Sequence, residues 1–164
     1  GVQTCALPIS LHELRTQIIS PMTDELKTDK EEDADELFQQ HIEAQCKRLR
    51  ILGFTGTPII RGNLNAMDKS LLPSLQTVCT EILNNIAKHG KPGAFAFILS
   101  VGPDAVRIFA SNLYNAAINS APENHYGTAL IQDFAQQHNG TMTINSENEE
   151  WSLSLAIPLT HQTH

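Results

Sequence analysis

TEILNNIAKHG, residues 80–90, holds the apolar spacing and the polar groups that decide how this chain folds. Its apolar residues continue a pattern that starts at Leu71 and marks one face at roughly 100° per residue, as an amphipathic helix requires. Gly90 ends the pattern, and Pro92 forbids its continuation. The sequence therefore predicts a helix over residues 71–89, with an apolar face formed by Leu72, Leu75, Cys79, Ile82, Leu83 and Ile86.

The polar side of this helix has two interpretations. Glu81, Asn85 and His89 are four residues apart, so successive side chains lie about 40° further round the helix and form one stripe, with Lys88 beside it. Carboxylate and carboxamide oxygens are ligands that Mg²⁺ prefers when it also binds phosphates, and the two basic side chains could neutralise those phosphates. The same residue types are common on solvated helix faces, where Lys88 and His89 favour the C-terminal end of the helix dipole. Spacing alone favours the solvated face.

The rest of the chain alternates helical and strand patterns around this helix. Helical spacing predicts further helices over residues 10–20, 35–52 and 128–138. A short strand is predicted at TPIIRGN (57–63), and two hairpins pair AFAFILSV (94–101) with AVRIFAS (105–111) and TMTINS (141–146) with WSLSLAIPL (151–159). Residues 113–126, rich in Asn, Ala, Ser and Pro, read as a long mobile loop, which is often a functional lid. One antiparallel or mixed sheet with helices on one face gives an α+β, two-layer sandwich.

Composition excludes several function classes. With 164 residues, 41% of them apolar and 18% charged, the chain fits one globular domain with a short attachment. The net charge of -7 is mostly local, because residues 24–36 hold eight acids and two lysines; no basic surface for nucleic acid is indicated. Three cysteines, Cys5, Cys46 and Cys79, are too few and too scattered for a disulfide framework or a zinc site. No apolar run approaches a membrane span, so no direct membrane contact is expected.

TEILNNIAKHG resembles the N box of the GHKL ATPase superfamily. The form E-x-x-x-N-x-x-K-H is typical of sensor histidine kinases whose response regulators carry helix-turn-helix output domains, and it falls on Glu81, Asn85, Lys88 and His89. The resemblance extends from Leu11 to Leu159. LHELR is similar to the late helix of the dimerisation domain, and LRILGF with TPIIRG is similar to the entry into the catalytic sheet. GTALIQDFAQQHNGTMTI is similar to the second glycine box with its helix. WSLSLAIPL is similar to the last strand of the family.

The resemblance implies a GHKL (Bergerat-type) two-layer α/β sandwich, with a mixed sheet and helices on one face. It implies that Asn85 binds the Mg²⁺ that bridges the phosphates of ATP and that Glu81 organises the metal or its water. Lys88 and His89 would meet phosphate.

The sequence departs from the family at both glycine boxes. In the first box, Ser111 stands where the family has an aspartate that accepts a hydrogen bond from adenine, Asn112 matches, and Leu113 replaces a glycine. Losing a bond to a charged acceptor costs roughly 1.5 to 3 kcal/mol, or about ten- to a hundredfold in affinity.

In the second box, Gly127, Thr128 and Leu130 match, and Ala129 replaces a glycine. A left-handed Ala129 would cost about 1 to 2 kcal/mol. A right-handed one would cost nothing, and the amides at Thr128 could still receive phosphate.

The implied domain organisation has five parts. The first nine residues, GVQTCALPI, resemble a translated sequencing adapter, so the natural chain is expected to continue upstream of Ser10. The remaining parts are the end of a dimerisation helix (10–23), an acidic linker (24–36), the ATP-binding domain (37–160) and a tail (161–164).

The implied function is the ATP-binding catalytic domain of a two-component sensor histidine kinase. It would transfer the γ-phosphate of ATP to a histidine on a dimerisation domain upstream of this sequence, because His12 lacks room for the usual helical hairpin after it. Expected partners are a second copy, bound through the missing dimerisation helices, and a response regulator. A cytosolic location is expected, alone or as part of a membrane-anchored receptor.

Two alternatives stay open. Ser111 and Leu113 favour a non-catalytic GHKL-fold contact module that has lost its nucleotide, whereas the intact N box argues against one. An anti-sigma serine kinase shares the E-x-x-x-N pattern. It usually has a longer lid than residues 112–127 and begins directly with a strand.

Overall fold

The computed structural model describes residues 25–114 and 126–160, with side chains over 34–114 and 128–160. The predictions for the adapter-like residues 1–9, the helix over 10–20, most of the loop over 113–126 and the tail 161–164 lie outside these ranges. The chain divides into two units, residues 1–37 and residues 38–164. The sheet and the core belong to the second unit, and the predicted domain limits stay a prediction.

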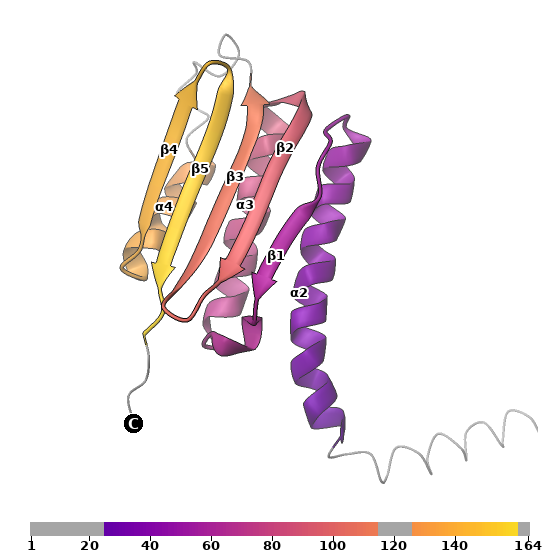
Figure 1. The fold of residues 1–164 in the computed structure, drawn as a ribbon, viewed down its shortest axis with the longest axis vertical. Helices are drawn as coiled ribbons and strands as arrows, with labels where there is room; N and C mark the ends of the chain where they lie inside the picture. The colour runs from indigo at the N-terminus through magenta and orange to yellow at the C-terminus, as the bar shows by residue number, and fades with distance from the viewer. Residues whose placement is uncertain (1–24, 115–125, 161–164) are drawn as a thin grey trace, which may run out of the picture. The chain divides into compact units, whose positions relative to one another are not determined.

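Five strands form one mixed sheet in the order β1-β2-β3-β5-β4 (Figure 1). β1 pairs in parallel with β2, and all other neighbours are antiparallel. Every strand predicted from the sequence is present, and the predicted α+β class with a mixed sheet is confirmed. The strands are β1 (Pro58–Gly62), β2 (Gly90–Val101), β3 (Ala105–Tyr114), β4 (Thr141–Glu147) and β5 (Glu150–Pro158).

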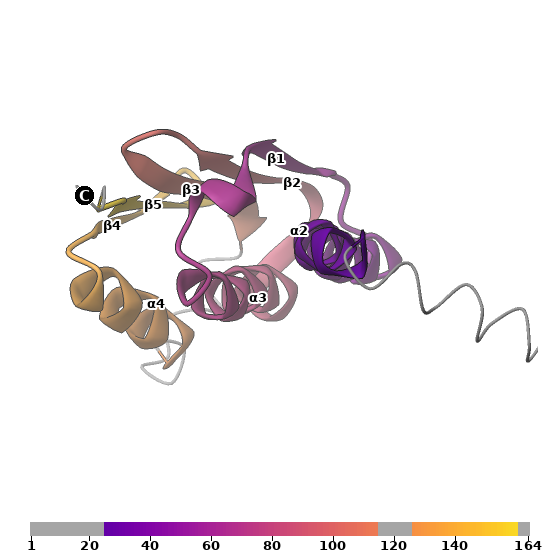
Figure 2. The ribbon, with the colours of Figure 1, turned by 90° about the horizontal axis from the view of Figure 1, so that it is seen from below.

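Strict alternation gives the sheet one buried and one exposed face, because successive strand side chains point to opposite sides. The buried face carries Phe97, Leu99, Ile108, Leu153 and Leu155, each at most 2% exposed. The opposite face, the outer face, carries the intervening residues. No α-helix of the described chain covers the outer face (Figure 2).

The helices lie together on the buried face (Figure 2). The helix predicted over 71–89 is confirmed as α3 (Leu71–His89), and α4 (Tyr126–Gln137) begins two residues before its predicted start. A short 3-10 turn, η1 (Leu64–Ala66), precedes α3. None of the described helices is long and apolar enough to cross a bilayer.

The prediction that the second helix begins near Asp35 is wrong. The helix α2 (Glu25–Ile51) begins inside the acidic stretch, ten residues before the predicted start. High charge alone does not break a helix, since Glu and Lys are good helix formers and acids are favoured in the first turn. The stretch contains neither proline nor glycine.

The second half of α2 completes the helical layer beside α3. Two side-chain hydrogen bonds join the helices: His41 Nε2 to Thr80 Oγ1 at 2.8 Å, and Arg48 Nη2 donating to Asn84 Oδ1 at 3.0 Å. Gly53, with a φ of 97°, follows the helix in the left-handed conformation that glycine adopts without strain. The α2 residues buried at helical spacing are Phe38, Ile42, Cys46 and Leu49.

Cys46 and Cys79 are free thiols buried in this core. Burial raises the pKa of Cys46 to about 11, with a further contribution from the negative charge of Glu43. Burial also raises the pKa of Cys79. Both are therefore neutral packing residues.

Candidate functional site

The last turn of α3 and the first turn of α4 lie at the same end of the sheet. Gly90 directly follows α3 and pairs with Tyr114, the last residue of β3. β4 follows α4 and begins at Thr141. Thr141 pairs with Ala156 of β5, and Ala156 pairs in turn with Arg107, which lies near the opposite end of β3. α4 therefore begins at the Gly90 end and runs antiparallel to α3, against which it packs (Figure 1).

Two neighbouring asparagines of α3 have different environments. Asn84 accepts a hydrogen bond from Arg48 and so belongs to the contact with α2. Asn85 lies about 100° further round the helix and is only 9% exposed, yet its Nδ2 has no hydrogen-bond partner. An unpaired buried amide costs about 1 to 3 kcal/mol, and most such groups in proteins are satisfied. Asn85 therefore has an amide that is available to a group outside the described residues.

The remaining residues of the predicted stripe surround Asn85 on α3. Glu81 and His89 are half-buried, and Lys88 is exposed. His89 also has an interaction of its own with another residue. Glu81, Asn85, Lys88 and His89 thus lie together on about the last two and a half turns of one helix.

A divalent cation could bind here only with help from a ligand. Over residues 34–114 and 128–160, no group of three His, Cys, Asp or Glu side chains could hold a metal ion. The carboxamide of Asn85 can turn by 180° and present Oδ1, a hard oxygen, in place of Nδ2. One protein oxygen, completed by phosphate oxygens and water, is a usual way for proteins to bind Mg²⁺. The donor set therefore fits Mg²⁺ that arrives with phosphates.

The structure places Asn112, and not Ser111, beside the end of α3. Asn112 continues the buried face of β3 and is 4% exposed, and its Nδ2 donates to the Leu113 carbonyl oxygen at 2.7 Å. A Cβ at Gly90 would lie 2.5 Å from this Nδ2. Ser111 faces the outer side, between its strand partners Ala96 and Ser152.

The alternation of β3 could have shown this from the sequence. Val106, Ile108 and Ala110 are the buried residues of the strand, so the next residue on their face is Asn112. The motif alone assigns the aspartate position of the family to Ser111, whereas the strand period assigns the position beside α3 to Asn112. The structure therefore does not bring Ser111 into this group of residues, and Leu113 is 40% exposed on the same side as Ser111.

Gly90 allows the close approach of these elements. A Cβ there would lie 2.4 Å from the Ile86 carbonyl oxygen and 2.9 Å from Phe54 Cε1, as well as against Asn112. Contacts this short to a backbone oxygen cannot be relieved by turning a side chain. The junction between α3 and β2 therefore requires a residue without a side chain.

The first turn of α4 contains the residues of the second predicted box. Gly127, Thr128 and Ala129 are all helical, and Ala129 is right-handed, since the described non-glycine residues with positive φ are Asn139, Asn148 and Glu149. Ala129 therefore carries no backbone strain. Thr128 is half-buried and makes a polar contact, and Leu130 is 41% exposed. Amides of a first helical turn lack intrahelical acceptors and can bind an anion.

Several solved structures of similar fold are histidine kinases. No protein-family profile and no curated protein matches this sequence. A nucleotide-free catalytic domain of the histidine kinase ThkA has 12% sequence identity and a TM-score of 0.57, over 77% of this chain and 95% of that one. The histidine kinase AdeS of Acinetobacter baumannii has 11% identity and a TM-score of 0.56, over 95% of this chain and 85% of that one.

The chain has the fold of a histidine-kinase catalytic domain. A blue-light activated histidine kinase of Erythrobacter litoralis, EL346, also shares it, with 11% identity and a TM-score of 0.52 over 73% of this chain and 41% of that one. At these identities the likeness to histidine kinases establishes the fold and not the reaction. Which ligand this histidine-kinase fold binds therefore has to follow from its own residues.

Proposed function

We propose that this chain is the ATP-binding catalytic domain of a sensor histidine kinase. The observation that carries the proposal is the buried, unpartnered amide of Asn85, located where α3 ends beside the first turn of α4. On a histidine-kinase fold, an unsatisfied amide at this position needs a partner, and a nucleotide with its metal ion supplies one.

Asn85 would hold Mg²⁺ through Oδ1, and Glu81 would orient the metal or its water. Lys88 and His89, together with the first-turn amides at Gly127 and Thr128, would bind phosphate oxygens, and Leu130 would line the same end of α4. Mg²⁺ supplies charge neutralisation of the triphosphate when it is bound. Phosphoryl transfer depends chiefly on positioning and on such neutralisation, so these residues need not include a strong base.

Asn112 replaces Ser111 in this proposal as the residue that meets the adenine base. It is the polar side chain on the buried face of β3, at the end of α3. An amide oxygen can accept a hydrogen bond from the adenine amino group, as a carboxylate does, but without the charge. Because neutral hydrogen bonds are weaker than charged ones, we expect weak rather than absent nucleotide binding.

The γ-phosphate would pass to a histidine on a dimerisation domain outside the described residues, and from there to a response regulator. A homodimer formed through dimerisation helices would present that histidine. A cytosolic location is part of the same proposal.

Calorimetric titration with Mg²⁺-ATP tests the proposal. The wild-type chain is expected to bind in the micromolar to millimolar range and to lose binding when Mg²⁺ is chelated. Asn85→Ala should weaken binding at least tenfold, whereas Asn84→Ala, which changes the neighbouring asparagine on the α2 side, should leave the affinity nearly unchanged. Absence of heat at millimolar nucleotide would contradict the proposal and favour the non-catalytic contact module.

A further inference from the structure

β4 is the last strand of the sheet, and its side away from β5, the free edge, pairs with no strand of the described chain (Figure 1). Apart from the ladder with β5, no backbone hydrogen bond among the described residues involves β4. α4 lies on the buried face of the sheet and not along this edge (Figure 2). The free edge therefore presents backbone groups that no described residue satisfies.

The hairpin turn between β4 and β5 decides which backbone groups point outward. Glu147 pairs with Glu150 around Asn148 and Glu149, whose φ values of 54° and 63° are those of a type I′ turn. The two residues that flank such a turn are hydrogen-bonded to each other, and bonded and non-bonded pairs then alternate along the ladder. The β4 residues whose N–H and C=O groups point away from β5 are therefore Met142, Ile144 and Ser146.

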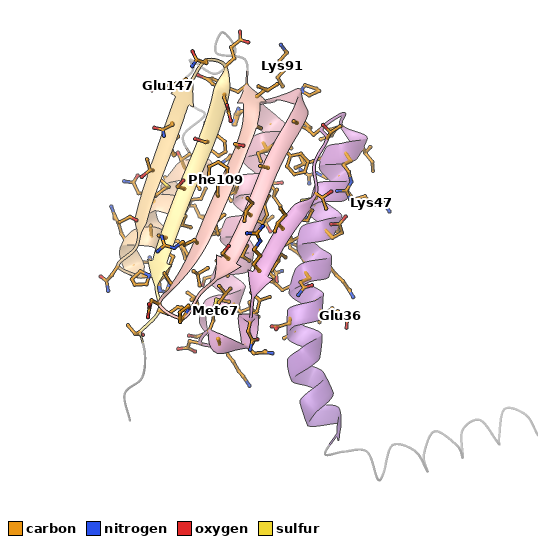
Figure 3. All side chains as sticks on the ribbon, in the orientation of Figure 1. Glu36, Lys47, Met67, Lys91, Phe109 and Glu147 are labelled. Carbon is orange, nitrogen blue, oxygen red and sulfur yellow. The ribbon has the colours of Figure 1, made fainter. Side chains whose placement is uncertain are left out.

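The free edge lacks the features by which edge strands usually avoid pairing. Proline, lysine, a bulge or a very short strand normally blocks such an edge. β4 has seven residues in an unbroken register with β5, and it contains neither proline nor a basic residue. Its one charged residue, Glu147, lies at the hairpin end (Figure 3). The opposite edge strand, β1, is shorter, begins with Pro58 and carries Arg61, so the sheet is protected at that edge only.

Two apolar side chains of β4 are incompletely buried beside the free edge. Met142 and Ile144 pack against the core, but both are only half-buried. Their partners on β5, Leu155 and Leu153, are at most 2% exposed. The two rows differ because β5 has a strand on each side and β4 has one on one side only. A further strand beside β4 would therefore complete the burial of this row.

We propose that β4 pairs with β4 of a second copy of this chain, which joins the two sheets into one. A two-fold axis perpendicular to the sheet makes the two strands antiparallel and keeps both helical layers on the same side. An axis at Ile144 places Ile144 opposite its own copy and Met142 opposite Ser146 of the other copy. The three pairs so formed exchange two hydrogen bonds each, six in all.

This register is the only antiparallel one that uses every free group of the edge. A shift in either direction pairs one of the three outward residues with the hairpin turn or with a residue before the strand. The side chains agree with the register, because Ile144 meets an apolar side chain at the centre. Glu147, the only charged residue of the strand, faces Thr141 of the other copy and not another acid.

A second copy fits the free edge better than an unrelated peptide does. A single peptide strand would satisfy the same backbone groups, but its own far side would become the new unprotected edge. A second copy removes both free edges at once. The joined sheet then ends in β1 on each side, where the proline and the arginine discourage further pairing.

The contact is small, so the dimer is weak. Seven residues of strand are about 20 Å long, and a contact one strand wide is below the usual size of stable interfaces. Association is therefore concentration-dependent. The free edge includes none of the residues around Asn85, so strand pairing and nucleotide binding are independent.

Sedimentation of the full 164-residue chain with a variant at Ser146 tests the pairing. Ser146→Pro removes an N–H that β5 does not use, so the fold should persist. Because two-fold symmetry removes this donor twice and the ring obstructs the partner strand, the dimer dissociation constant should rise at least about tenfold. Ser146→Ala is the matched control, since it keeps the N–H and should leave association unchanged.

Charged variants at the centre test the register. Ile144→Lys and Ile144→Glu each place like charges directly opposite each other in the dimer, so each alone should stay monomeric. An equimolar mixture places lysine opposite glutamate and should form the dimer. Circular dichroism checks that each variant is folded, and the Ser146 pair decides if the Ile144 variants are not.

Hydrogen exchange identifies what covers the free edge. The amides of Met142, Ile144 and Ser146 should exchange more slowly as the chain concentration rises. Protection that does not depend on concentration would mean that another segment of the same chain covers the edge, which overturns the proposal. A wild-type chain that stays monomeric at about 1 mM, Ser146→Pro that associates like the wild-type chain, or a mixture of folded Ile144 variants that gains nothing also overturns it.

Discussion

At the scale of single residues, Asn84 and Asn85 show what a sequence can and cannot predict. Both are asparagines within TEILNNIAKHG, and this residue type suits a solvated face or a ligand site equally well. Only the arrangement of the neighbouring helices distinguishes them, because Arg48 satisfies Asn84 and nothing in the described chain satisfies the Nδ2 of Asn85. Those helix contacts join residues far apart in the sequence, so spacing along one helix could not reveal them.

Replacing the two asparagines should have opposite effects on stability. Asn84→Ala removes the bond to Arg48 and should lower the free energy of unfolding by about 0.5 to 1.5 kcal/mol. Asn85→Ala removes a buried donor that has no partner, so the free energy of unfolding should stay the same or rise by up to about 1 kcal/mol. Urea denaturation without nucleotide measures both. A loss of more than about 1 kcal/mol for Asn85→Ala would mean that the amide has a structural partner.

A methyl group at Gly90 should disturb the site and the fold together. Gly90→Ala places a Cβ 2.4 Å from the Ile86 carbonyl oxygen, and such overpacking typically costs about 1 to 3 kcal/mol. Gly102→Ala is the control, since its Cβ would meet only the Ala105 carbonyl oxygen at an ordinary 3.4 Å. Thermal unfolding compares the two, and equal melting temperatures would contradict the close packing around Gly90.

At the scale of elements, periodicity predicted the strands and α3 well, because their apolar residues follow one clear period over many positions. It failed where charge dominates: the acidic start of α2 has no apolar face to read, yet its residues favour helix. Motif alignment failed in β3. There the alternation of buried and exposed residues decides which polar side chain lies beside α3, and it selects Asn112 instead of Ser111.

The conformation of Ala129 can be tested by substitution. Because Ala129 is right-handed in the first turn of α4, Ala129→Gly should lower the free energy of unfolding by about 0.5 to 1 kcal/mol. Nucleotide affinity should change little, since the amides are already in place. If Ala129 were left-handed, glycine would instead stabilise the chain by about 1 to 2 kcal/mol, so the sign of the change in a denaturant titration decides.

At the scale of the whole molecule, the sequence predicted the layers better than the connections. An α+β sandwich followed from the order of the elements, but the parallel pairing of β1 with β2 did not. That pairing joins strands separated by α3, and no local pattern reports on a crossover of this kind. The outward-pointing backbone groups of β4 likewise could not be predicted, because they depend on the register of its hairpin with β5.

The buried thiols should make the fold sensitive to alkaline pH. The pKa of Cys46 rises from an ordinary 9.0 to about 11 on folding, because burial favours the neutral thiol. Its contribution to stability is fully present below about pH 9 and is lost as the pH rises toward 11. The free energy of unfolding should therefore fall less steeply between these limits in Cys46→Ala than in the wild-type chain. Parallel curves for the two proteins would contradict the burial of this thiol.

A crystal structure of the chain with Mg²⁺ and a non-hydrolysable ATP analogue is the decisive test of nucleotide binding at Asn85. We expect Mg²⁺ about 2.1 Å from Oδ1 of Asn85, phosphate oxygens at the first turn of α4, and the base beside Asn112. A nucleotide bound elsewhere, or a metal ion that does not touch Asn85, would contradict it.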